Sequence, residues 1–140
     1  MISFFKHDVT CILKDIRHYQ KWLKELMALY GRRPGALNFI FCSDLYISEM
    51  NQYYLGHEGP TDVITFDYSD GFSKVPICAD IYIGIETVRR NAIEFGAASF
   101  EEELLRVMAH GLLHLFGYKD DTVEEQRLMR TLENAAMCLY

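Results

Sequence analysis

Two histidines and two aspartates near the C-terminal end of the chain are the residues best suited to chemistry. They lie in the segment HGLLHLFGYKDD, residues 110–121, where His110 and His114 are four residues apart. Side chains at this spacing share one face of an α-helix, so both imidazoles can reach one ion at about 2.0–2.1 Å, the distance that zinc prefers. By itself the pair is more simply explained as two core histidines that are satisfied by hydrogen bonds; the glycine and the acid that follow it make a metal site the favoured interpretation.

A third ligand is expected from the loop that follows the histidines. Gly117 is a suitable residue to end the helix, and Asp120 lies six residues after His114. A glycine turn lets the loop fold back, so Asp120 is the preferred third ligand and Asp121 beside it is the alternative. Three protein ligands leave one position open for water, which is typical of a catalytic zinc site.

The residue after the first histidine distinguishes this pattern from the common zinc peptidases. Those enzymes carry H-E-x-x-H, in which the glutamate acts as general base. The corresponding residue here is Gly111, so peptidase activity is not expected. Glycine inside a helix costs about 1 kcal/mol relative to alanine. Its presence indicates that a neighbouring element or a substrate approaches the backbone at this point.

The rest of the chain is expected to form the strands and helices that position this helix. Residues rich in β-formers predict strands at 2–7, 36–43, 62–68 and 77–86. Apolar residues at helical spacing and helix-end signals predict helices at 10–30, 43–55, 86–95, 99–116 and 122–138. This order predicts one α+β domain over residues 1–140, in which helices pack on a small mixed four-stranded sheet.

Local signals support several of these boundaries. Ser43 or Asp44 is expected to cap the second helix. Residues 99–102 and 122–125 each match the S/T-x-x-E capping box, which opens a helix. The sequence SDGF, residues 69–72, predicts a turn between the last two strands.

Composition narrows the class of protein. Half of the residues are hydrophobic, which is enough for a real core, but no apolar run approaches the ~20 residues that span a bilayer. The N-terminus lacks the pattern of a secretory signal, and the four cysteines form no C-x-x-C pair. A cytoplasmic protein with no membrane partner is therefore expected.

The charge distribution bears on possible nucleic-acid partners. The net charge of −6 by itself argues against nucleic acid. Residues 1–40, however, carry seven Lys/Arg against three Asp/Glu, whereas residues 41–140 carry seven against seventeen. The basic N-terminal part can contact phosphates, although a solvated helix face explains it more simply.

Three segments together resemble the YbeY family. HGLLHLFGYKD is similar to its signature H-G-x-L-H-L-x-G-Y-[D]-H. MNQYYLGHEGPTDVITFDY resembles its L-N-x-x-x-R-x-x-x-x-P-T-D-V-L-S-F stretch. CADIYIGIETVRRNA resembles its G-D-I-x-I strand and the helix after it. The segments cover residues 50–92 and 110–120 in the family's order, about half of the chain.

This resemblance implies a zincin-like α+β fold and an endoribonuclease with one zinc ion per chain. The implied substrate is single-stranded RNA, and the implied role is ribosome maturation, through processing of the 3′ end of small-subunit ribosomal RNA, together with ribosome quality control. His110 and His114 are the implied catalytic residues and metal ligands, and Asp120 falls where the family usually has a third histidine. The ribosome, or a basic ribosomal protein attracted by the negative charge, is the expected partner; DNA is not.

The chain departs from the family pattern at two positions. Asp120 in place of a histidine makes the site more negative, which should weaken the Lewis acidity of the ion and raise the pKa of its bound water. Leu55 stands where the family has an arginine, a residue that can clamp a phosphate. Candidate substitutes are His57, Arg89 and Arg90. The alternative function is therefore a ribosome-associated assembly factor with a structural metal and little or no nuclease activity.

Overall fold

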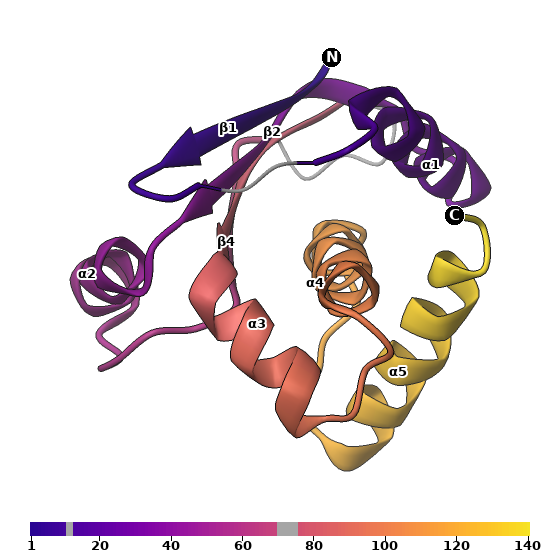
Figure 1. Cartoon of the computed structure of the whole chain (residues 1–140). Coiled ribbons are helices and arrows are strands. Elements are labelled where there is room, and N and C mark those ends of the chain that lie inside the picture. Colours follow the sequence, from indigo (N-terminus) through magenta and orange to yellow (C-terminus); the bar gives the residue numbers. More distant parts are fainter. Residues whose placement is uncertain (11–12, 70–75) are drawn as a thin grey trace.

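The protein folds into a four-stranded sheet with five helices, as described by a computed structural model for residues 1–10, 13–69 and 76–140 (Figure 1). The elements in chain order are β1 (Ile2–His7), α1 (Ile16–Leu29), β2 (Pro34–Cys42), α2 (Asp44–Leu55), β3 (Val63–Asp67), β4 (Ile77–Gly84), α3 (Ile85–Glu94), α4 (Phe100–Leu115) and α5 (Val123–Met137). The predicted order and the α+β class are both confirmed.

The sheet has the strand order β1-β2-β4-β3 and is mixed, as predicted. The pairs β1–β2 and β2–β4 are parallel, whereas β3 runs antiparallel to β4. Every second residue of the inner strand β4 is buried: Ile77, Ala79, Ile81 and Ile83. This alternation gives the sheet one apolar face on which the main core is built.

Helix α4 lies at the centre of the fold, between the sheet and the helices α1, α3 and α5 (Figure 1). It is buried on most of its circumference because apolar residues surround its axis, as is typical of a core helix. Helix α2 packs on the opposite face of the sheet, where Ile47 and Met50 meet Cys42 and Ile64. The site helix is thus held by neighbours on nearly every side.

Some predicted boundaries are wrong by several residues. Helix α1 begins at Ile16, with the Asp15 side chain accepting a hydrogen bond from the His18 N–H, rather than near residue 10. Residues 11–12, and most of the predicted turn at 69–72, lie outside the described residues. The strand predicted to reach Glu86 ends at Gly84, and helix α3 begins directly after it.

The predicted capping signals are largely confirmed. Ser43, rather than Asp44, caps helix α2. Thr122 and Glu125 form a complete capping box at the start of α5. Ser99 accepts from the Glu102 N–H, but the Glu102 carboxylate accepts from the Ala98 N–H, so this box is incomplete. None of the described helices has both the length and the apolar character needed to cross a bilayer.

Candidate metal centre and its cleft

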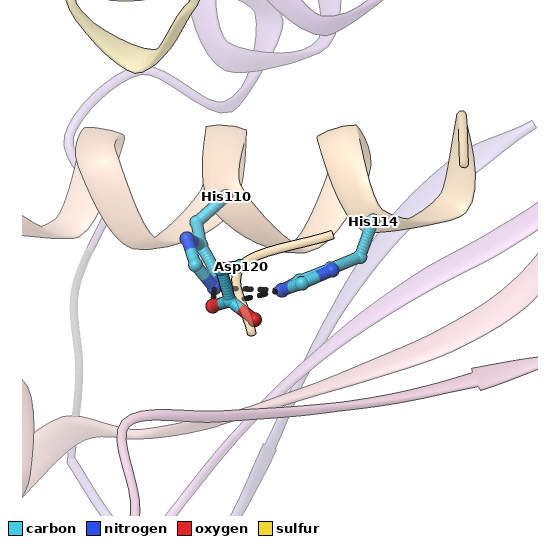
Figure 2. Close-up of side chains that lie close together, drawn as sticks. All are labelled: His110, His114 and Asp120. Carbon is cyan, nitrogen blue, oxygen red and sulfur yellow. Dashed lines mark hydrogen bonds and ion pairs between the residues drawn. The ribbon is translucent and has the colours of Figure 1, made fainter. Parts of the chain in front are cut away.

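Helix α4 and the loop after it bring three potential metal ligands together. Figure 2 shows His110 and His114 pointing from the same side of α4 toward Asp120 of the loop. The helix stops because Gly117 takes a left-handed conformation, with φ 104°, which favours glycine. Tyr118 then donates its N–H back to the Leu113 carbonyl at 3.1 Å, and the chain reverses toward the histidines.

The distances between these side chains are close to those of a three-ligand site. The Asp120 Oδ2 lies 3.3 Å from His110 Nε2 and 3.4 Å from His114 Nε2, and the two Nε2 atoms are 2.9 Å apart. Ligand atoms placed tetrahedrally at about 2.0–2.1 Å from zinc lie roughly 3.3 Å from one another. These three residues can therefore hold a metal ion. Asp121 is exposed and does not belong to this group.

The hydrogen bonds of the two rings also suit a cation. His110 Nδ1 lies 2.7 Å from a Glu133 carboxylate oxygen, and His114 Nδ1 lies 2.9 Å from the Tyr118 carbonyl. An ionised carboxylate and a carbonyl only accept, so in both cases Nδ1 carries the proton. In the neutral rings, both Nε2 atoms then present lone pairs toward the Asp120 carboxylate. A group of three acceptors facing one another is the donor set that a metal ion requires.

Glu133 is a residue of the site that the sequence reasoning missed. It comes from α5 and is only 5% exposed. Burial lowers the pKa of His110, but the hydrogen bond and charge of Glu133, with the charges of Asp120 and Asp62, outweigh burial and raise it. The sequence feature that could have revealed Glu133 is its place on the apolar face of an amphipathic helix, between the buried residues Met129 and Ala136.

An open cleft of about 570 Å³ is lined in part by the three potential ligands. It runs between the end of α2, strand β3 and helix α4, and its lining residues are Asn51, Leu55, His57, Thr61, Asp62, Val63, Ile64, Thr65, His110, His114 and Asp120. The segments 50–68 and 110–120, which carried the family resemblance, thus form the two walls of one cavity.

The three candidate substitutes for the arginine that is absent at position 55 differ in whether they line the cleft. His57 lines the cleft beside Leu55. Arg90 instead forms an ion pair with Asp44 at 2.7 Å, and the Arg89 guanidinium lies 5.1 Å from the centroid of the Phe100 ring. Neither arginine lines the cleft.

Buried Asn51 fixes the loop that carries His57. The Asn51 side-chain amide donates to the Gly59 carbonyl at 3.0 Å, and the Asn51 backbone carbonyl accepts the His57 N–H at 3.1 Å. Gly56, with φ 68°, ends α2 in the left-handed conformation and starts this turn. Asn51 is therefore a structural residue, and the turn it holds directs residue 57 to the cleft.

At Gly111 the backbone of α4 lies close against the sheet. A Cβ atom at this position would lie 3.2 Å from a methyl group of Ile81 and 3.4 Å from methyl groups of Thr65 and Val63. Of the two explanations that the sequence allowed, the neighbouring element is the one observed. The backbone of α4 packs directly on β3 and β4, which leaves no space for the glutamate of a zinc peptidase.

Comparisons with known proteins agree with this arrangement. The family model described as Endoribonuclease YbeY matches residues 5–139. Two curated relatives with that name, from Flavobacterium psychrophilum and Phocaeicola vulgatus, are 44% and 45% identical, over 100% and 99% of this chain and 96% and 98% of their own length. The solution structure of the Thermotoga maritima protein TM1509 matches with a TM-score of 0.66 at 28% identity, covering 99% of this chain and 88% of that one. The fold, the cleft and these matches together show that the chain belongs to the YbeY family.

Proposed function

We propose that this chain is a zinc-dependent endoribonuclease that cuts single-stranded RNA. Residues 1–140 form its single hydrolase domain, and His110, His114 and Asp120 are the ligands of one zinc ion. Its biological role is ribosome maturation in the cytoplasm, through processing of the 3′ end of small-subunit ribosomal RNA and ribosome quality control. The names of the relatives, Endoribonuclease YbeY, support the activity.

One observation carries the proposal: three acceptor atoms converge on the wall of an open cleft, on a scaffold that leaves no space for a peptidase base. A zinc ion held there supplies Lewis acidity for a phosphodiester and a lowered pKa for water. The open side of the three-ligand group faces the cleft, so a substrate can approach without displacing a protein ligand.

The protein's own contribution in the cleft is to bind and orient the RNA backbone. His57 extends from a turn fixed by Asn51 and can donate a ring N–H to a phosphate oxygen. Leu55 beside it offers only apolar contact. His57 therefore takes over, in weaker form, the phosphate contact that an arginine would make.

The alternative function is an assembly factor whose metal is structural. A structural zinc site is closed, usually with four protein ligands, whereas this group has three ligands and borders a cleft of about 570 Å³. The open geometry and the names of the relatives favour the enzyme.

The net charge of −6 bears on how RNA is reached. An acidic surface gains little from non-specific attraction to phosphates. A basic ribosomal protein bound beside the cleft would bring the enzyme to ribosomal RNA by complementary charge. Retention of ribosomal proteins by the immobilised chain, lost at high salt, is the expected result; recovery of none would contradict this part of the proposal.

Cleavage of a circular single-stranded RNA tests the activity directly, because only an endonuclease can linearise it. We expect the zinc-loaded protein to linearise the circle, and a chelator or His114→Ala to abolish the reaction. His7→Ala, an exposed histidine at the end of β1, is the matched control and should remain active. An intact circle after incubation with zinc-replete wild type would overturn the proposed activity.

A further inference from the structure

Glu133 connects the helix α5 to the candidate metal centre. One of its carboxylate oxygens accepts a hydrogen bond from His110 Nδ1 at 2.7 Å, on the side of the ring opposite the atom that faces His114 and Asp120. The side chain is almost entirely buried, with 7% of it exposed. A buried carboxylate is costly unless its oxygens are paired.

Two arginines complete the surroundings of this carboxylate. The second oxygen of Glu133 lies 3.1 Å from the guanidinium of Arg106, whose side chain is 18% exposed, and 3.8 Å from that of Arg130. Arg106 precedes His110 by one helical turn, so both project from the same face of α4. The arginine fixes one carboxylate oxygen, and the other oxygen is left directed at the histidine.

We propose that Glu133 is a positioning residue for the metal ion, a role that rests on the proposed metal site. By accepting from Nδ1–H, its carboxylate holds the tautomer of His110 in which Nε2 is free to coordinate, and it fixes the plane of the ring. A hydrogen-bonded carboxylate behind a histidine ligand also increases the basicity of that ligand. Through the contacts of Glu133 with Arg106 and His110, the packing of α5 on α4 thus fixes the orientation of a metal ligand.

The second histidine has a different support, which makes the role of Glu133 specific. His114 Nδ1 donates to the backbone carbonyl of Tyr118, so the tautomer of this ring is set by the chain reversal itself. Changes at position 133 should therefore act on His110 and leave His114 in place.

Zinc affinity, measured on the full chain by competition with a chromophoric chelator, tests the inference without relying on catalysis. We expect Glu133→Ala to bind zinc about 10- to 100-fold more weakly than wild type. Glu133→Gln keeps an acceptor oxygen and should lose less, and it serves if the alanine variant does not fold. Glu124→Gln, an exposed position on the same helix, makes the same charge change and should bind as wild type does.

The ring nitrogens of His110 give a second readout that needs no metal. Nitrogen NMR of the metal-free protein at alkaline pH, where the imidazoles are neutral, should show Nδ1–H in wild type and a mixture of tautomers in Glu133→Ala. Wild-type zinc affinity in a folded Glu133→Ala variant would overturn this inference alone. Absence of zinc binding by wild type would instead overturn the metal site, and this inference with it.

Discussion

The Nε2 atoms of His110 and His114 lie 2.9 Å apart, although both rings donate their Nδ1 protons to other acceptors, Glu133 and the Tyr118 carbonyl. Two lone pairs cannot make a hydrogen bond to each other. The Asp120 carboxylate lies 3.3 Å and 3.4 Å from the same two atoms, so a positive charge among the three atoms, either a proton or a metal ion, stabilises the arrangement. The hydrogen bonds of Nδ1 to Glu133 and to the Tyr118 carbonyl therefore turn both Nε2 atoms toward the point where a cation can bind.

The two neighbouring aspartates should differ in their effect on metal binding. Asp120→Ala removes a carboxylate that faces both histidines, and we expect loss of most of the bound zinc. Asp121→Ala changes the same charge one residue away and should retain it. Metal content by elemental analysis of the two purified variants checks this. Equal zinc loss in both variants would show that charge, and not position 120, governs binding.

A shortened side chain at His57 should reduce RNA cleavage without reducing metal content. We expect a loss of at least about tenfold in the cleavage rate for His57→Ala, below the roughly 10²–10³-fold effect of a buried oxyanion donor, because this side chain is exposed. Leu55→Arg, made in the same background, should recover activity by placing a guanidinium in the cleft.

Arg90→Ala is the matched control for the His57 variant. It removes a positive charge whose partner is Asp44, outside the cleft, so the cleavage rate should remain that of wild type. If Arg90→Ala slows cleavage as strongly as His57→Ala does, the phosphate contact has been assigned to the wrong residue.

Gly111 should resist even the smallest substitution. Alanine improves helix propensity by about 1 kcal/mol, but its methyl group would meet three methyl groups of the sheet at 3.2–3.4 Å. Overpacking of a core typically costs about 1–3 kcal/mol. We therefore expect Gly111→Ala to lower the free energy of unfolding by about 1 kcal/mol in urea denaturation. An increase in stability would mean that the strands β3 and β4 can move away from α4.

Glu103 provides a pH-dependent test of the buried surroundings of the site. Burial raises the pKa of this carboxyl, and Asp62 adds to the rise although Arg106 opposes it. The folded pKa lies above the unfolded value of about 4.3, so the contribution of this carboxyl to the free energy of unfolding is complete below that pH. This contribution is lost as the pH rises through the folded pKa. Glu103→Gln should therefore be more stable than wild type at neutral pH.

The comparison of the two proteins across pH checks the sign of this effect. The advantage of Glu103→Gln in urea denaturation should decrease on acidification and vanish below about pH 4.3, where the wild-type carboxyl is protonated in both states. A difference in stability that does not change with pH would indicate a packing effect instead of ionisation.

Local signals in the sequence were sufficient to predict the element order and the proximity of His110, His114 and Asp120. His110 and His114 share a helix face, and the left-handed Gly117 turns the chain so that Asp120, three residues later, lies beside them. Short-range geometry therefore brings the three side chains together. The first residue of α1 was harder to predict. Apolar residues at helical spacing continue before Ile16, but the Asp15 cap fixes where the helix begins. Caps depend on one hydrogen bond, which periodicity does not reveal.

Contacts between segments that are far apart in the chain could not be predicted from the sequence. Glu133 is separated from His110 by 23 residues, and only the packing of α5 on α4 brings them together. The choice of His57 over Arg89 and Arg90 likewise depends on which side chains reach the cleft. The sequence offered all three residues equally, and the contacts of Arg90 with Asp44 and of Arg89 with Phe100 hold both arginines elsewhere.

The zinc content of the purified chain tests the central claim most directly. Wild type, prepared without chelators and dialysed against metal-free buffer, should retain one equivalent of zinc, whereas His114→Ala should retain almost none. Circular dichroism of both proteins would establish that each is folded. A folded wild type that retains no zinc, or a His114→Ala variant that retains a full equivalent, would contradict the account.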